Sequence, residues 1–544
     1  MKKTILFTLL LAPMFCFPQM DALVFFADKQ NVAASIANPI TILSQAAIDR
    51  KMAQGIVIDE RDVPVNETYK AAVANASGIT VLSKSKWMNA VYVRGSVSNI
   101  NNLLNLSFVT DVEFMDKGLN RPFQPKRAID KFNIEEQERV VYNYGAAQNQ
   151  VEMIGVDVLH SSGYDGEDIL VAFMDNGYPN VLSNPAYSHL INESRLLGYY
   201  DFVYRTTDPT GSGSHGSATL SDAAAVVEHS NPDLAFVGTA PKASYYLFIT
   251  EDSASETPVE EAYWVEALER ADSLGVYVTN TSLGYQAYDN PAFDHSYADL
   301  DGQTTLAARG ANHAFDKGMI NVTSAGNQGR WWDFGYVGTP ADAPGSFTVG
   351  AVDFAENYVE FSSYGPTVDG RVKPDVMAQG SGSAIVNQIG EVDYSSGTSF
   401  SSPIIAGAVA SLWEAAPNLK NNVVMQVIRE SASHFNNPTY NMGYGIPDFG
   451  LALNALIQLD VEQQMQENFF AVYPNPVTTE INISFPKSAD QAEFVLYNVL
   501  GEIVLKTKIS PLKNRLDVSR FTSGMYIASI TSNNKTTSFK IIKK

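Results

Sequence analysis

Strand-like and helix-like patterns alternate along the middle of the chain, between about residues 150 and 457. Continuous apolar runs predict the strands, and "PVEEAYWVEALERADSLG" predicts one of the helices. The strand-like runs are "DILVAFMD", "SYYLFI", "VYVTNTSLG", "INVTSAGN" and "FTVGAVD". Runs of this kind, alternating with helices, are typical of a parallel α/β sheet with both faces covered. We therefore expect an α/β domain over residues 149–458.

The two flanking regions follow different patterns. Residues 20–116 read β–α–β–β–α–β, from "ALVFFAD" to "VTDVEFM", which is the order of a ferredoxin-like α+β fold with an added segment at 40–60. Residues 470–544 contain only short strand-like runs, such as "EINISF" and "GMYIASIT", and predict a small β-sandwich. Polar connectors are expected at 117–148 and at "VEQQMQEN" after Leu459.

The first residues predict a secretory signal peptide over 1–19. Lys2 and Lys3 precede a short apolar run, from Ile5 to Phe17, that is too short to span a bilayer. The one cysteine of the chain, Cys16, lies inside this segment. The mature protein is therefore expected to contain no thiol, which excludes a cysteine nucleophile, disulfides and thiolate metal sites.

The net charge of the chain limits the classes of molecule that it could bind. The chain of 544 residues has a net charge of −22, which argues against nucleic acid, because phosphates need a basic surface. The charge is unevenly distributed, since residues 470–544 carry ten Lys+Arg against five Asp+Glu. That segment is therefore +5, and the remainder of the chain is −27.

Five serines lie close together in "SSGTSFSSP" (395–403), directly before an apolar run. A serine becomes a nucleophile only with a base, an orienter for that base and donors for the oxyanion. Gly397 permits a tight turn before Ser399, and Pro403 is expected in the first turn of the following helix. Ser399 would then lie at a helix N-terminus, and the other serines would cap or pack. Taken alone, Ser399 could equally be an N-cap residue.

Three further segments carry polar side chains suited to this chemistry. "ILVAFMDNGY" ends a strand at Asp175, at the edge where open α/β sheets place their sites. "GSGSHGSATLSDAAA" places His215 among small residues, and "INVTSAGNQG" places Asn327 after a strand. Each has a simpler interpretation if taken alone, which is a turn for Asp175 and Asn327 and a helix cap for His215.

Together these segments resemble the subtilase family of serine proteases. Asp175-Asn-Gly, His215-Gly-Ser and Gly-Thr-Ser399-Phe-Ser-Ser-Pro match its three catalytic boxes in the family's order, Asp, His, Ser. Asn176 stands where Ser or Thr is commoner, and Ser217 where Thr is commoner. Neither change removes a chemical group that the mechanism needs. The resemblance covers roughly residues 150–457 and implies the subtilisin-like α/β fold.

The resemblance also implies roles for individual residues. Ser399 would be the nucleophile, His215 the general base and acid, and Asp175 the orienter of the imidazole. Asn327 and the Ser399 N–H would stabilise the oxyanion. "NTSLGY" (280–285) resembles the substrate-binding strand of the family. The residues expected to bind substrate are Ser282, Leu283, Gly284, Ala325 and Gly326.

The flanking regions fit the same picture. Residues 20–116 resemble an inhibitory prodomain, and "YPNP", "LYNVLGE" and "GMYIASI" resemble the C-terminal sorting domain of the type IX secretion system. The expected partners are protein or peptide substrates, the prodomain and the secretion machinery, and the expected location is outside the cell or on its surface. No cofactor is expected. Structural calcium is common in the family, but the sequence places no calcium site.

Three other functions were weighed against a protease. The first is a catalytically inactive relative that binds peptides, but all three catalytic residues are present. The second is an adhesin or glycan-binding module, which the small C-terminal region without an aromatic platform does not favour. The third is a glycosidase, but acids such as Asp299 and Asp301 lie in no paired context, and "DLDG" lacks the rest of an EF-hand loop.

Overall fold

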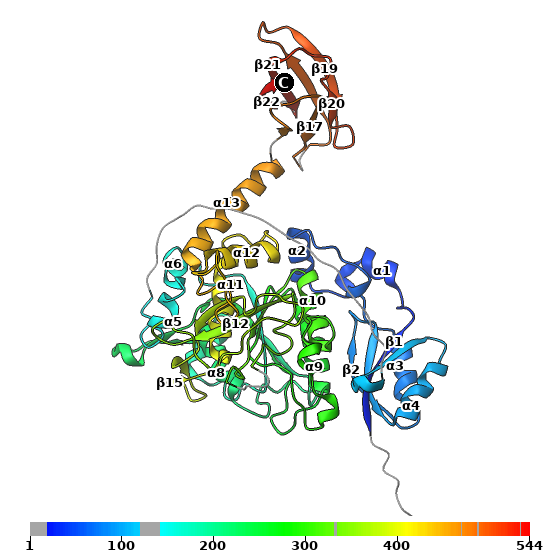
Figure 1. Ribbon diagram of the computed structural model, residues 1–544, viewed down its shortest axis with the longest axis vertical. Coiled ribbons are helices and arrows are strands. Elements are labelled where there is room, and N and C mark those ends of the chain that lie inside the picture. The colour runs from blue at the N-terminus through cyan, green and yellow to red at the C-terminus, as the bar shows by residue number, and fades with distance from the viewer. Residues whose placement is uncertain (1–18, 120–141, 331–334, 469, 487–488, 534) are drawn as a thin grey trace, which may run out of the picture. The chain divides into compact units, whose positions relative to one another are not determined.

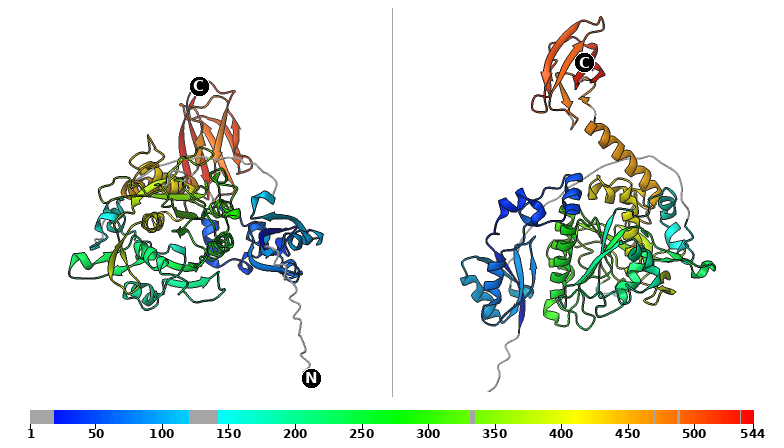
Figure 2. Two further views of the ribbon diagram at one scale, coloured as in Figure 1. Left: turned by 60° about the horizontal axis from the view of Figure 1, so that its bottom comes forward. Right: turned by 180° about the vertical axis from the view of Figure 1, so that it is seen from behind.

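A computed structural model describes residues 19–119, 142–330, 335–468, 470–486, 489–533 and 535–544, without the side chains of 461–468. Most of the expected signal peptide and most of the first connector lie outside these described residues. The chain divides into two compact units with a boundary near residue 454. Figures 1 and 2 show both units from three sides. Within the described ranges, no helix has the length and apolarity needed to cross a membrane.

A seven-stranded parallel sheet forms the centre of the first unit. In spatial order its strands are β13 (Val376–Gln379), β12 (Ser346–Val352), β11 (Ile320–Ser324), β10 (Val278–Thr281), β5 (Leu170–Asp175), β9 (Ser244–Ile249) and β6 (Leu196–Asp201). All five apolar runs named above lie in this sheet. The residues of β10, β11 and β12 are buried throughout, as expected for a sheet covered on both faces.

Helices cover the two faces of this sheet. Figure 1 shows α9 and α10 on one side and α8 and α11 on the other. These four are α8 (His215–Ala224), α9 (Val259–Leu274), α10 (Leu306–Asp316) and α11 (Thr398–Glu414). Helix α11 is buried along almost its whole length, which explains why its sequence is apolar on all sides. The unit also contains α5 (Gln148–Glu152), α6 (Val156–Ser161), α7 (Ser188–Asn192), α12 (Asn421–Ser431), β7 (Val226–Val227), β8 (Phe236–Val237), β14 (Ser383–Val386) and β15 (Val392–Ser395).

The strand order changes direction at β5. From β5 the sheet grows one way through β9 and β6 and the other way through β10, β11, β12 and β13. In open α/β sheets the loops diverge at such a point and leave a crevice at the carboxyl ends of the strands. Asp175 is the last residue of β5, and therefore lies at this crevice.

The N-terminal region forms a four-stranded antiparallel sheet in the order β2-β3-β1-β4, which confirms the expected β–α–β–β–α–β arrangement. The added segment at 40–60 contains helix α2. The elements are β1 (Met20–Phe26), α1 (Val32–Ala37), α2 (Gln45–Ala53), α3 (Glu67–Ala74), β2 (Ile79–Ser85), β3 (Ala90–Gly95), α4 (Val97–Asn102) and β4 (Val109–Phe114).

This N-terminal sheet packs against α9 of the same unit (Figures 1 and 2). Glu269 of α9 accepts three hydrogen bonds from the turn 85–87, at 2.6, 2.8 and 3.0 Å. Asp272 lies about one helical turn further on. It pairs with Arg50 and Lys51 of α2, both at 2.6 Å, and the side chains of all three residues are fully buried. The contact is therefore rich in buried charge.

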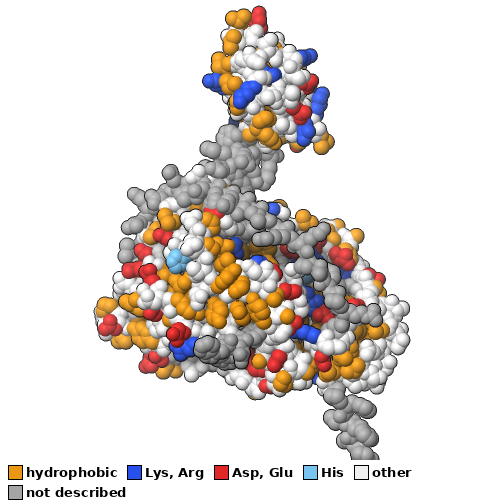
Figure 3. Space-filling view, in the orientation of Figure 1, with side chains coloured by type: hydrophobic (Ala, Val, Ile, Leu, Met, Phe, Trp, Pro, Cys, Tyr) orange, Lys and Arg blue, Asp and Glu red, His pale blue; other side chains and the backbone are white. Residues whose placement is uncertain are grey.

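The second unit contains two antiparallel sheets that share one buried core. Ile481 from one sheet and Phe494 from the other belong to the same cluster, in line with the expected sandwich. On the face shown in Figure 3, several Lys and Arg side chains lie on this unit. The first sheet contains β16 (Ala471–Tyr473), β17 (Glu480–Ser484) and β20 (Arg515–Asp517), and the second contains β19 (Ile503–Ile509), β18 (Ala492–Tyr497), β21 (Gly524–Ser532) and β22 (Lys535–Lys543).

The polar connector expected after Leu459 is helical. Helix α13 (Phe449–Asn468) runs through it. The segment contains neither glycine nor proline, and its Gln, Glu and Met residues all favour helix. Polarity without such helix-breaking residues therefore does not predict the end of a helix.

Candidate active site

Asp175 and His215 meet where β5 ends and α8 begins. The Nδ1 atom of His215 lies 2.9 Å from each carboxylate oxygen of Asp175. The side chain of Asp175 is only 4% exposed, whereas that of His215 is 36% exposed and can reach a substrate. Gly216 makes this approach possible, because a Cβ at that position would lie 2.9 Å from the Cβ of Asp175.

The hydrogen bonds around Asp175 determine which ring nitrogen of His215 carries the hydrogen. Asn176 N donates to the carboxylate at 2.8 Å, and Thr219 Oγ1 donates to it at 3.2 Å. Because the carboxylate only accepts hydrogen bonds, Nδ1 of His215 must carry hydrogen, which leaves Nε2 as the acceptor. The negative charge of Asp175 raises the pKa of His215, although burial opposes this shift. The sequence had not singled out Thr219, since a hydroxyl one helical turn after a histidine belongs to no motif.

Ser399 is the second residue of α11, at the N-terminus of that helix as expected. Its Oγ donates to the backbone oxygen of Ser282 at 3.2 Å. Among the described residues no hydrogen bond joins this Oγ to His215. The imidazole nevertheless lies beside the same turn, since its ring centre is 6.0 Å from that of Phe400. Catalytic hydrogen bonds are often loose before a substrate binds.

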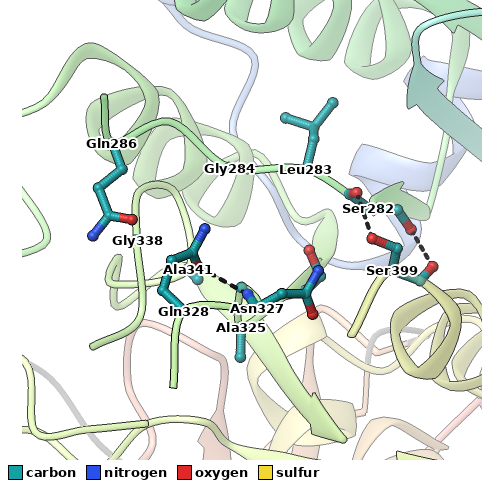
Figure 4. Close-up of a pocket in the computed structure, with 12 residues that line it drawn as sticks. Ser282, Leu283, Gly284, Gln286, Ala325, Asn327, Gln328, Gly338, Ala341 and Ser399 are labelled. Atoms are coloured by element: carbon teal, nitrogen blue, oxygen red, sulfur yellow. Dashed lines mark hydrogen bonds between the residues drawn. The ribbon is translucent and has the colours of Figure 1, made fainter. Parts of the chain in front are cut away.

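The expected position of Pro403 in the first helical turn is wrong. The helix begins at Thr398, so Pro403 is its sixth residue and lies inside it. Proline lacks an N–H, and the backbone oxygen of Ser399 therefore loses its helical donor. The hydroxyl of Ser282 replaces that donor, at 2.8 Å (Figure 4).

Asn327 lies opposite the start of α11. Its Oδ1 accepts hydrogen bonds from Thr398 N at 2.9 Å and from Thr398 Oγ1 at 3.0 Å. Because a backbone N–H can only donate, the atom facing it must be the amide oxygen, and the NH2 group must point elsewhere. The N–H of Ser399, at the second position of the helix, has no helical acceptor. Among the residues that the structure describes, neither this N–H nor the Asn327 NH2 group has a hydrogen-bond acceptor.

A pocket opens beside Ser399 (Figure 4). Its lining contains all five residues expected to bind substrate, together with Asn327 and Ser399. Asp175 and His215 are not part of the lining. The sequence interpretation missed five other lining residues. They are Gln286, Ser324, Gln328, Gly338 and Ala341.

The sequence could have indicated some of these missed lining residues but not others. Ser324 and Gln328 flank the stretch 325–327 and could have been included by extending it. Gly338 and Ala341 come from a loop that carries no motif. Tyr285 N donates to Thr339 O at 2.7 Å, and this contact brings the loop against the segment that follows β10 and contains Ser282. Only the folded chain shows this pairing.

Within the described ranges, no group of three or more His, Cys, Asp or Glu side chains is arranged to hold a metal ion. Asp301 of the "DLDG" segment caps a turn, accepting from Gln303 N and Thr304 N, both at 2.8 Å. Asp299 pairs with Lys117 at 2.8 Å. Among the described residues, both acids therefore have structural partners.

Comparisons with protein families match three successive parts of the chain. The model of the peptidase S8 propeptide domain of Bacteroidota matches residues 21–131. The model of the subtilase family matches residues 166–445, which include every residue of the site described above. The model of the secretion system C-terminal sorting domain matches residues 471–544.

Characterised relatives agree with the family match. Subtilisin NAT of Bacillus subtilis subsp. natto is 28% identical over 307 residues, which are 56% of this chain and 71% of the relative. Subtilisin of Bacillus pumilus is 28% identical over 291 residues, 53% of this chain and 93% of the relative. The membrane-bound transcription factor site-1 protease of Rattus norvegicus is 30% identical over 270 residues, 48% of this chain and 22% of the relative.

Proposed function

Because this chain belongs to the subtilase family and is a serine endopeptidase, we propose that it hydrolyses peptide bonds through an acyl-enzyme on Ser399. The observation that carries the proposal is the position of Ser399. It lies at a helix N-terminus, next to the Asp175–His215 pair and at the edge of the pocket. A nucleophile, a base with its orienter, and free donors are the groups that acyl transfer needs.

The proton moves through His215 in both halves of the reaction. Its Nε2 takes the hydroxyl proton as Ser399 Oγ attacks the scissile carbonyl, and later delivers this proton to the leaving amine. Water then attacks the ester by the same route and releases the acid. Asp175 holds Nδ1–H at 2.9 Å, keeps Nε2 free to accept and stabilises the imidazolium.

The oxyanion forms next to two donors. The amide NH2 of Asn327 and the N–H of Ser399 stabilise the negative charge that develops on the carbonyl oxygen. Thr398 supports this role of Asn327 because its two hydrogen bonds hold the amide oxygen on the opposite side. The positive end of the α11 dipole adds to the stabilisation.

The substrate backbone is proposed to lie along residues 282–284, as an added strand. The side chain before the scissile bond would enter the pocket, with Ala325 and Gly326 in one wall. None of the described residues that line this pocket is charged. We therefore expect a preference for uncharged side chains at that position, and cleavage of a peptide library by the purified protease would test it.

A fluorophosphonate probe tests the nucleophile. The wild type should be labelled at one residue, Ser399, and Ser399→Ala should be neither labelled nor active. Labelling at another serine would overturn the assignment. An unlabelled, folded wild type would instead favour a catalytically inactive, peptide-binding relative.

Maturation follows from the three matched domains. A propeptide domain joined to a subtilase domain indicates inhibition by the prodomain, and the sorting domain indicates type IX secretion of an extracellular or cell-surface protease. We propose that the chain cuts itself between about Met115 and Val140. Residues 21–116 then stay bound as an inhibitor, and a second cut near 459–470 releases the sorting domain.

N-terminal sequencing of the secreted protein tests this maturation. If the protease acts on its own connector, Ser399→Ala should accumulate as an uncut precursor. The same processed N-terminus in wild type and variant would mean that another protease makes the cut.

A further inference from the structure

A buried chain of polar side chains links β10 to the start of α11 behind the nucleophile. Its members are Asn280, Ser282 and Ser402, which are 0, 3 and 0% exposed. The chain ends on the backbone oxygen of Ser399, the atom that loses its helical donor because Pro403 has no N–H. The turn that carries the nucleophile is therefore held from outside its own helix.

The hydrogen bonds of this chain can run in only one direction. The backbone oxygen of Ser399 only accepts, so the hydroxyl of Ser282 must donate to it, at 2.8 Å. That hydroxyl has one hydrogen, and its second bond, at 2.9 Å, must come from Nδ2 of Asn280. The amide oxygen of Asn280 then faces Ser402, whose hydroxyl donates to it at 2.9 Å. By donating to the Ser282 oxygen, the Asn280 amide leaves the one hydrogen of that hydroxyl for the Ser399 oxygen.

We propose that Asn280 is a positioning residue for the nucleophile, and that its amide orients the Ser282 hydroxyl toward the backbone of Ser399. The proposal deepens the proposed function and rests on it. The backbone oxygen of Ser282 also accepts from Ser399 Oγ, at 3.2 Å, so two hydrogen bonds join Ser282, directly after β10, to the nucleophile. Shifting either point moves the attacking oxygen relative to the pocket that receives the substrate, and a displacement of about 1 Å can cost about 10²-fold in rate.

The substitution Asn280→Asp tests the direction of the bonds without changing the shape of the side chain. An ionised carboxylate only accepts, so the Ser282 hydroxyl would turn toward it and leave Ser399 without its donor. The matched control is Asn321→Asp. Asn321 is equally buried on the adjacent strand β11, and its bonds go to Thr279, Thr281 and Ser346 rather than to α11.

Each variant is expressed as the full chain, and the secreted enzyme is titrated with the fluorophosphonate probe so that rates refer to active molecules. We expect Asn280→Asp to lose about 10- to 100-fold in kcat, with KM changed by less than about threefold. Asn321→Asp should keep the wild-type kcat per active molecule, even where its melting temperature falls. Equal kcat values for the two Asp variants would overturn the positioning role.

A milder pair of variants covers the case in which Asn280→Asp does not fold. Ser402→Ala removes the donor to the Asn280 amide, and Ser411→Ala removes an equally buried hydroxyl of α11 that donates to Thr239 O at 2.7 Å. Ser402→Ala should lower kcat about 3- to 10-fold and Ser411→Ala should not. Equal rates would overturn the proposal. A wild type not labelled at Ser399 would overturn the proposed function as well.

Discussion

Two regions of the peptidase domain differ in chemistry. One is the surface that contacts the prodomain, and the other is the pocket beside Ser399. At the prodomain contact, Asp272 pairs with Arg50 and Lys51 without any exposure to water, and Glu269 accepts three hydrogen bonds. The part of the pocket lining that the structure describes consists of small or neutral residues. A buried charge left unpaired costs several kcal/mol, so the first surface suits one partner. The second can accept extended chains of varied sequence.

This difference implies that inhibitor recognition and catalysis are separable. Substitutions beside the pocket should change rates without releasing the prodomain, and substitutions on α9 should release the prodomain without changing rates.

Ser399→Ala should remove almost all activity. The corresponding loss in subtilisin is about 2 × 10⁶ in kcat. The affinity for the added, isolated prodomain should stay unchanged, because the charged contact lies on α9. Residual turnover by a clean Ser399→Ala preparation well above the background rate would contradict the assignment.

Asp175→Asn should lower kcat by about 10⁴, the loss that the same substitution causes in a chymotrypsin-like protease. The substitution should also shift the acid limb of the pH dependence of kcat/KM. Asp175 raises the pKa of His215, and the reaction needs the neutral imidazole, so activity falls as pH drops through that raised pKa. Without the carboxylate this pKa falls, and the limb should shift to lower pH. A limb that stays in place in kcat/KM profiles would show that another group controls it.

Asn327→Ala should lower kcat by about 10²- to 10³-fold with little change in KM, because the amide acts on charge present only in the transition state. Steady-state kinetics with one peptide substrate would measure both constants. If only KM changed, Asn327 would be a ground-state contact.

The sequence predicted the catalytic residues better than the residues that hold them in place through hydrogen bonds. Asp175, His215 and Ser399 lie in continuous motifs, and the parallel sheet follows from its apolar runs. Thr219 and Asn280 lie inside segments that the motifs do mark, but neither residue received a role, because each acts through hydrogen bonds to other elements. The sequence does not predict the charged prodomain contact either. Arg50 and Asp272 are 222 residues apart, and in the sequence each resembles an ordinary surface charge.

The last prediction concerns this contact directly. Asp272→Asn should weaken prodomain binding by about 3–5 kcal/mol, because Arg50 and Lys51 would stay buried without their carboxylate. Burial alone would raise the pKa of Asp272, but Lys51, Lys86 and Arg50 lower it to about 2. The carboxylate therefore contributes to binding above its usual pKa, and this contribution is lost as pH falls toward about 2.

The control is Asp316→Asn, whose partner Arg61 also belongs to the prodomain, at 3.0 Å. Because the Asp316 side chain is 56% exposed, its loss should cost less than about 1 kcal/mol. Inhibition constants of the isolated prodomain against the processed enzymes would measure both effects. The kcat of both variants should equal that of the wild type, since neither residue lines the pocket. Similar inhibition constants for the two variants would show that buried charge does not carry the affinity, and a lowered kcat for Asp272→Asn would show that the two surfaces are coupled.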